Sequence, residues 1–171
     1  MTSRQKGRLS FEAAFLCGCR AWLLLLHSGV AGPVMWAGLM AETISQEPLF
    51  TAVDLLLPVP LADEKLRARG FNQAALLAEE IGRLLQVPIS GRVLLKDYET
   101  SAQAGLTRTA RESNLSGVFR VANTNAVQGK NIMIIDDVFT TGCTMSTAAL
   151  ALRDAGARHV FGLTAAAGRY F

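Results

Sequence analysis

Two adjacent aspartates are the residues in this sequence best suited to chemistry. Asp136 and Asp137 come directly after the apolar run Ile132–Ile135. Two carboxylates at a strand end repel each other, so such a pair is tolerated where it meets hydroxyl groups or a cation. The pair therefore predicts a site for a hydroxyl-bearing ligand or a metal ion.

The loop after the aspartates has what a phosphate monoester needs. Gly142 lets the backbone turn closely, so successive N–H groups can point into the turn. A helix that begins near Cys143 presents its positive end. The helix dipole supplies only ~0.3–2 kcal/mol, so most of the binding must come from hydrogen bonds, including those of the threonine hydroxyls. The predicted phosphate-binding residues are Val138, Thr140, Thr141, Gly142, Cys143 and Thr144.

A second interpretation is that the aspartates end a strand and the threonines cap a helix. Either half of the motif alone would favour that interpretation. Both halves occur together, directly after an apolar strand and directly before a helix, which favours a ligand site. The other common phosphate signatures, GxGxxG and GxxxxGK followed by Ser or Thr, are absent from the sequence.

Alternating strand and helix patterns must position these residues. Apolar runs predict strands at 53–57, closed by Pro58, and at 89–95, 117–122, 132–135 and 159–164. The spacing of Leu77, Ile81, Leu84 and Leu85 predicts a helix over 73–86, with Asn72 at its N-cap. A second helical stripe ends at Gly156 and comprises Met145, Ala148, Ala149 and Leu152. This order predicts an α/β fold with a mainly parallel sheet flanked by helices.

Three other segments lie outside this pattern. Residues 96–117 are polar and predict a long loop with a short helix near 107–113, and residues 123–125 predict a turn. Residues 1–50 read as a separate N-terminal segment of two apolar helices, at about 9–27 and 34–46, before a domain over 51–171.

Composition narrows the class of protein. The chain has 171 residues, of which 50% are hydrophobic and 18% charged, as in a compact domain. A net charge of +3 suits anionic ligands, but no basic run typical of a committed DNA binder is present. Cys17, Cys19 and Cys143 do not form a zinc pattern and are interpreted as ordinary thiols. The apolar stretch 11–30 is interrupted by charges and is too short for a membrane span, so we expect a cytoplasmic protein.

Three motifs together resemble a known family. Ile132–Met145 resembles the phosphoribosyl-diphosphate binding loop of type I phosphoribosyltransferases. Leu57–Leu61 followed by Arg67–Gln73 resembles a second signature of the ComF family, which includes competence-associated and GntX-like bacterial proteins. Gln103–Leu106, with Arg111 and Asn114, matches a third stretch. The resemblance covers about residues 53–168, and its three motifs together are highly specific.

The resemblance implies roles for these residues. It implies a type I phosphoribosyltransferase fold in which Asp136 and Asp137 meet the ribose 2′ and 3′ hydroxyls, with Mg²⁺ nearby. The loop 96–110 would close over the substrate. The pyrophosphate-binding residues implied are Val59, Pro60, Leu61, Arg67 and Arg69. Since displacing pyrophosphate from ribose C1 separates charge, basic side chains are also needed, and the candidates include Arg108 and Arg111.

The sequence leaves two functions open. One is Mg²⁺-dependent phosphoribosyl transfer to or from a base, with phosphoribosyl diphosphate or a nucleotide as ligand. The other is a non-catalytic phosphoribosyl or nucleotide sensor that serves in DNA uptake or in the use of DNA. Family members usually carry an N-terminal zinc ribbon, and place two arginines where this chain has Lys96 and Tyr98. Because tyrosine cannot offset pyrophosphate charge, this difference favours the second function. Single-stranded DNA and a second copy of the chain stay open as partners.

Overall fold

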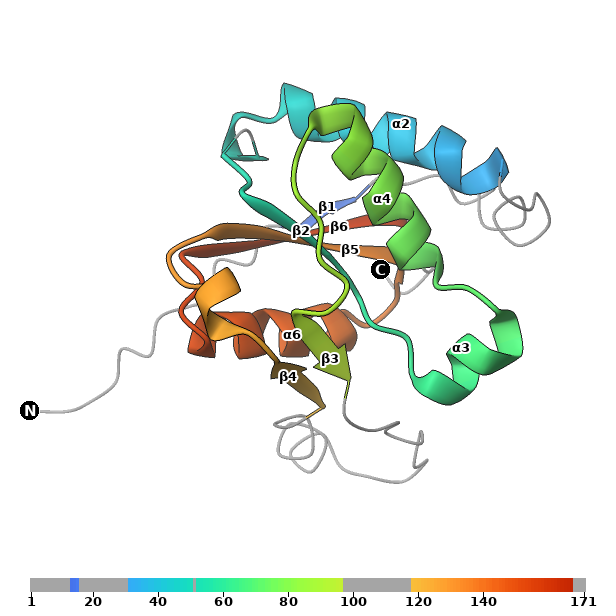
Figure 1. The fold of residues 1–171 in the computed structure, drawn as a ribbon. Coiled ribbons are helices and arrows are strands. Elements are labelled where there is room, and N and C mark those ends of the chain that lie inside the picture. The colour runs from blue at the N-terminus through green and yellow to red at the C-terminus, as the bar shows by residue number, and fades with distance from the viewer. Residues whose placement is uncertain (1–12, 16–30, 51, 97–117, 168–171) are drawn as a thin grey trace, which may run out of the picture.

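The computed structural model describes residues 13–15, 31–50, 52–96 and 118–167. Within them the chain forms alternating strands and helices around one parallel sheet (Figure 1). The strands are β1 (Ala13–Phe15), β2 (Leu55–Pro58), β3 (Leu94–Lys96), β4 (Phe119–Val121), β5 (Asn131–Phe139) and β6 (His159–Ala167). The α-helices are α2 (Ala31–Gln46), α3 (Asp63–Arg69), α4 (Gln73–Leu85) and α6 (Cys143–Asp154), with short 3-10 turns at Pro48–Phe50 and Thr124–Ala126.

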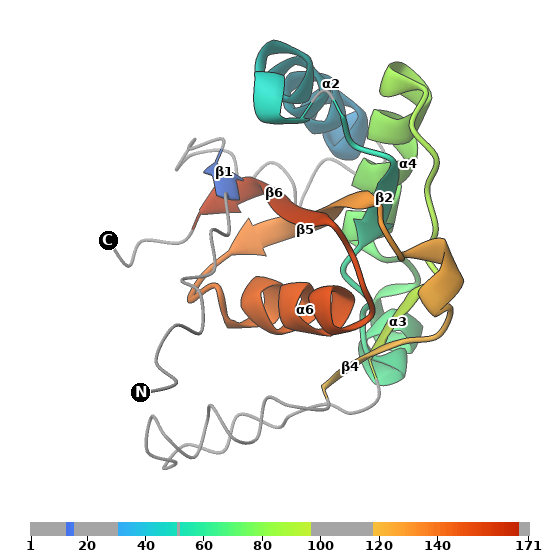
Figure 2. The ribbon, with the colours of Figure 1, turned by 90° about the vertical axis from the view of Figure 1, so that its left-hand side faces the viewer.

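The main sheet has the order β1-β6-β5-β2, and every neighbouring pair in it is parallel. Helices α2 and α4 cover one face and α6 covers the other, so the fold has three layers (Figures 1 and 2). The strands β3 and β4 form a small antiparallel sheet on the side of α6. The predicted α/β architecture with a mainly parallel sheet is therefore confirmed.

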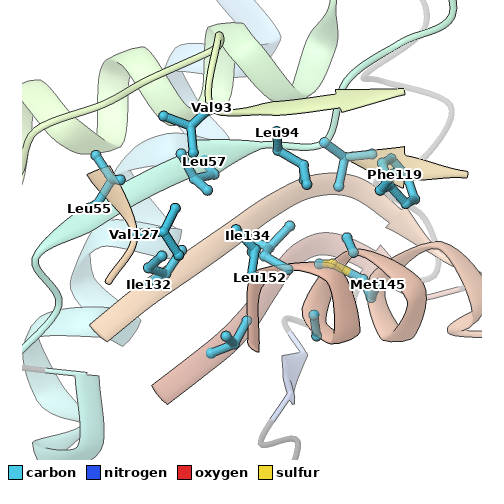
Figure 3. Packing of buried hydrophobic residues seen from close by; sticks show 14 of the residues in the cluster. Leu55, Leu57, Val93, Leu94, Phe119, Val127, Ile132, Ile134, Met145 and Leu152 are labelled. Atoms are coloured by element: carbon cyan, nitrogen blue, oxygen red, sulfur yellow. The ribbon is translucent and has the colours of Figure 1, made fainter. Parts of the chain in front are cut away.

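The central strand β5 is apolar on both faces because each face meets a helical layer. Ile132 and Ile134 pack in the cluster under α6, while Met133 and Ile135 pack in the cluster under α2 and α4. All four side chains are fully buried. Figure 3 shows the first cluster, in which Ile134 lies close to residues of α6 such as Leu152. Because both of its faces are packed, the position of β5 between the two helical layers is fixed, and the end of this strand carries the aspartates.

The helix α4 follows the predicted pattern closely. Its N-cap is Asn72, whose side-chain oxygen accepts a hydrogen bond from the N–H of Ala74 at 3.0 Å. Leu77 and Ile81 are fully buried against the sheet, as their spacing predicted, whereas Leu84 of the same stripe is 44% exposed. The helix ends at Gln86, which takes a left-handed conformation with φ of 57° just before Val87-Pro88.

Several local predictions were wrong. Residues 13–15 form the parallel edge strand β1 rather than part of a helix, because pairing with β6 satisfies their backbone groups. The predicted strand at 89–95 is instead an isolated bridge at Ile89 followed by β3, in two different sheets. Strand β2 begins only at Leu55, and the side chain of Asp54 just before it accepts a hydrogen bond from the N–H of Asn131. Helix α3 was not predicted at all.

The N-terminal helix α2 was predicted over 34–46 and is found over Ala31–Gln46. It packs against α4, and its residues Trp36, Met40 and Ile44 join the core on that face of the sheet. In the part of the chain that the structure describes, no helix is both long and apolar enough to span a membrane.

Candidate functional site

The aspartate pair lies inside the end of β5 rather than after it. The strand continues through both residues to Phe139, and Asp136 pairs in register with Thr164 of β6. This corrects the expectation that the strand stops at Ile135. The two residues are partly buried, and the N–H of Asp137 donates a hydrogen bond to Oδ1 of Asp136 at 2.9 Å. Because side chains alternate between the two faces of a strand, the position of each aspartate in β5 fixes the direction of its side chain.

The environment of Asp136 strongly favours its neutral form. Burial is the main cause, and the charge of Asp137 and a side-chain hydrogen bond with it act in the same direction. Together they raise the pKa of Asp136 from 3.8 to about 8. A backbone hydrogen bond from Asp137 and the charge of Lys96 act in the opposite direction. A carboxyl group in this state is stabilised in its charged form by a ligand that brings a cation or hydrogen-bond donors.

The loop from β5 to α6 has the geometry of an anion-binding turn. Gly142 is the N-cap of α6 with φ of 74°, a conformation that favours glycine. A Cβ at this position would lie 2.6 Å from Cζ of Phe139, so the ring leaves no space for a side chain. Within the described part of the chain no side chain caps the first turn of α6, whose N–H groups therefore point toward the loop. The loop's polar residues are exposed: Thr140, Thr141, Cys143 and Thr144.

The turn at Val59-Pro60-Leu61 lies beside the aspartates. The N–H of Val59 donates to the carbonyl of Ile135 at 2.9 Å, directly before Asp136. The side-chain nitrogen of Asn72 donates to the carbonyl of Val59 at 3.0 Å. Asn72 therefore ties this turn to the start of α4 while it also caps that helix. The sequence indicated its role as a cap, but the contact with Val59 depends on the tertiary structure.

The structure describes two of the four predicted basic residues. Arg67 and Arg69 lie on α3, which follows β2 at the same end of the sheet as the aspartates (Figure 1). Both are exposed, and Arg69 donates a hydrogen bond to Oε1 of Gln73 at 3.4 Å. Arg108 and Arg111 lie outside the described residues, as does Tyr98.

Lys96 is a functional candidate that the sequence reasoning missed. It is the last residue of β3, and its charge lowers the pKa of Asp136. The sequence showed it only as a replacement for an arginine of the family. The small sheet β3–β4 brings this cation to the aspartates from a position 40 residues earlier in the chain.

The sheet order, the helical layers and the acidic strand end define a phosphoribosyltransferase-type fold of type I. Two solved structures share it. One is described as the allosteric regulatory enzyme of purine biosynthesis, with a TM-score of 0.53, 17% identity, and coverage of 78% of this chain and 26% of that chain. The other is a glutamine phosphoribosylpyrophosphate amidotransferase from Bacillus subtilis, with a TM-score of 0.51, 18% identity, and coverage of 76% and 26%. At these identities the likeness concerns the fold alone.

The sequence is similar to competence and DNA-utilisation proteins. It is 33% identical to Competence protein F of Haemophilus influenzae over 108 residues, which is 63% of this chain and 47% of that protein. It is 37% identical to Competence protein ComFC of Bacillus subtilis over 102 residues, 60% of this chain and 39% of that protein. DNA utilization protein YhgH of Escherichia coli strain K12 is 35% identical over 107 residues, 63% of this chain and 46% of that protein.

These similarities confirm the resemblance to ComF-type proteins that the motifs indicated. The matched region spans about half the length of these relatives or less. No model of a known protein family matches the chain.

Proposed function

We propose that this chain binds the 5-phosphoribosyl group of phosphoribosyl diphosphate, or of a nucleotide, in the presence of Mg²⁺. In this proposal it transfers that group to or from a nitrogenous base in the cytoplasm. The observation that carries the proposal is the continuous segment from Asp136 to Thr144. There two carboxyl groups at the end of a buried strand lead directly into a glycine turn and a helix start with no side-chain cap.

Each part of the segment has a task in the proposed complex. The carboxyl groups of Asp136 and Asp137 accept hydrogen bonds from the ribose 2′ and 3′ hydroxyls. The loop from Thr140 to Thr144 surrounds the 5′-phosphate with N–H and hydroxyl donors. The turn at 59–61, held beside Ile135, faces the pyrophosphate. Lys96 and the exposed arginines of α3 supply positive charge at the same end of the sheet.

The donor set suits Mg²⁺ with a bound substrate. Among the described residues no group of three or more potential metal ligands occurs. Mg²⁺ is commonly held by one or two carboxylates, with water and substrate phosphates completing its shell, so a pair of aspartates fits that requirement. Asp136 and Asp137 would hold it indirectly, through water or the ribose hydroxyls. When bound, Mg²⁺ would neutralise charge that develops on the pyrophosphate.

The proposed reaction exchanges one bond at ribose C1 for another. The bond from C1 to the pyrophosphate oxygen breaks, and pyrophosphate leaves with the electron pair. A bond from C1 to a nitrogen of the base forms with the lone pair of that nitrogen, and its proton passes to water. Positive charge on the sugar in the transition state is stabilised by the nearby carboxylates, and negative charge on the leaving group by the basic side chains.

Calorimetric titration with phosphoribosyl diphosphate and Mg²⁺ at pH 8 tests the binding step. We expect Asp136→Asn and Asp137→Asn each to weaken binding about 10-fold or more, because each loses hydrogen bonds to a charged group. Asp154→Asn is the matched control, since Asp154 is exposed at the far end of α6. Equal affinity of the wild type and both site variants would contradict the proposal.

A second function is supported by the names of the relatives, which refer to competence and DNA utilisation. In this alternative the same site senses a phosphoribosyl ligand without transfer, and the chain takes part in DNA uptake or use. The net charge of +3 favours contact with a nucleic acid.

Two assays separate the functions. Pyrophosphate release with a panel of free bases supports the enzyme, whereas binding without turnover on any base supports the sensor. Affinity for a single-stranded oligonucleotide is then measured at several salt concentrations. A flat dependence on salt would count against contact with DNA, since phosphate contacts release counterions.

A further inference from the structure

Thr164 carries a buried hydroxyl that packing alone does not explain. The residue is 1% exposed, and its Oγ1 makes no hydrogen bond with any residue that the structure describes. A buried hydroxyl without a partner destabilises a fold, and valine has nearly the same shape without that cost. We therefore expect the hydroxyl of this threonine to have a role beyond packing.

Thr164 lies opposite Asp136 on the neighbouring strand. Thr164 and Asp136 are register partners on the parallel strands β6 and β5. Leu163 and Ala165 pack toward α2 and α4, so Thr164 between them faces α6. Ile135 also packs toward α2 and α4, so Asp136 faces α6 as well. Neighbouring strands are about 4.8 Å apart, which brings side chains on one face within hydrogen-bonding reach.

This shared face is the one beneath the proposed phosphate loop. Figure 2 shows α6 below β5 and β6, with the chain passing from the end of β5 to the start of α6 at one edge. Thr164 and Asp136 therefore share the face of the sheet that α6 covers. Rotation about one side-chain bond moves it among three staggered positions.

We propose that Thr164 is a positioning residue of the phosphoribosyl site, which rests on the proposed function above. In the bound state its hydroxyl donates a hydrogen bond to Asp136 and orients the carboxylate toward the ribose hydroxyls. In the structure the N–H of Asp137 donates a hydrogen bond to Oδ1 of Asp136, and the hydroxyl of Thr164 has no partner among the described residues.

Thr147 provides a matched control for stability. It is the other buried threonine of the described core, at 7% exposure, and it lies in α6 on the same side of the sheet. Unlike Thr164, its hydroxyl donates to the carbonyl of Cys143 at 2.8 Å. Replacement by valine therefore removes an existing hydrogen bond at Thr147 and removes none at Thr164.

The test combines unfolding of the ligand-free protein with calorimetry, using phosphoribosyl diphosphate and Mg²⁺. We expect Thr164→Val to keep or raise the Tm, whereas Thr147→Val lowers it. We also expect Thr164→Val to weaken binding by about 10-fold, the loss of one hydrogen bond to a charged group. Thr164→Ser should restore affinity to within about threefold of the wild type, since it keeps the hydroxyl.

Each contrary result has a distinct meaning. If the wild type binds but Thr164→Val binds equally well, the positioning role is wrong and the proposed function stands. If Thr164→Val lowers the Tm as much as Thr147→Val, the hydroxyl has a structural partner and the inference fails. If Thr164→Ser binds as weakly as Thr164→Val, the hydroxyl does not account for the affinity and the positioning role is wrong. Absence of binding by the wild type overturns the proposed function and this inference together.

Discussion

Replacing Asp136 by asparagine should stabilise the ligand-free protein. In the folded state burial and the neighbouring Asp137 raise the pKa of Asp136 from 3.8 to about 8. Between these pH values the folded protein holds a proton that the unfolded chain has released. Its free energy of unfolding therefore falls as pH rises through this range, and the contribution is lost above pH 8. Asparagine has no proton to lose and can still donate a hydrogen bond to Asp137.

The size of the effect follows from the two pKa values. At about 1.4 kcal/mol per pH unit, the full difference corresponds to roughly 6 kcal/mol. Adjustment of the side chains and entry of water reduce this value, so we expect Asp136→Asn to gain about 2 to 4 kcal/mol at pH 8. The gain should shrink steadily toward pH 4, where the wild-type carboxyl is protonated in both states.

Urea unfolding at pH 4, 6 and 8 without ligand measures this difference, and the buried Trp36 provides a fluorescence signal. Asp154→Asn controls for the removal of an exposed carboxylate. A loss of stability in Asp136→Asn at pH 8 would refute the reasoning, and so would a gain of the same size at every pH. The expected combination of higher stability and weaker ligand binding is typical of residues kept for function.

Three further substitutions test other parts of the structure. Gly142→Ala should lower the free energy of unfolding by about 1–3 kcal/mol, because the φ of 74° and the ring of Phe139 both oppose a side chain. It should also weaken the binding of ribose 5-phosphate. Unchanged stability in urea unfolding and unchanged affinity in calorimetry would exclude the proposed loop geometry. Asn72→Ala should lower the free energy of unfolding by about 1–2 kcal/mol, because the helix loses its cap. It should also weaken the binding of phosphoribosyl diphosphate more than that of ribose 5-phosphate, because the turn at Val59 is released. An equal effect on both ligands would argue against a pyrophosphate contact. Leu57→Ala should lower the free energy of unfolding by about 3–5 kcal/mol, since the side chain is fully buried in the cluster on the α6 side of the sheet. A loss below 1 kcal/mol in urea unfolding would be inconsistent with that packing.

Local features of the site could be predicted because they depend on neighbours in the chain. The burial of Ile132–Ile135, the glycine turn at Gly142 and the start of α6 near Cys143 follow from apolar runs, backbone freedom and helix periodicity. The same holds for α4, where Asn72 caps an amphipathic stretch. Such features are determined over a few residues, so pattern and position suffice to place them.

Other features needed the folded chain. A strand at 13–15 is set by pairing with β6, more than 140 residues later, and its apolar composition favoured a helix instead. The split between Ile89 and β3 likewise depends on which strand lies alongside. A short apolar segment is compatible with both helix and strand, so the partner decides.

The sequence by itself therefore determined the chemical content of the candidate site: the aspartate pair, the hydroxyls and the glycine turn. Only the tertiary structure decided which residues surround Asp136. Strand order places Thr164 beside it, β3 brings the charge of Lys96 to it, and a backbone hydrogen bond holds Val59 next to Ile135. These contacts join segments far apart in the chain, and their formation depends on the packing of the whole sheet rather than on any local preference.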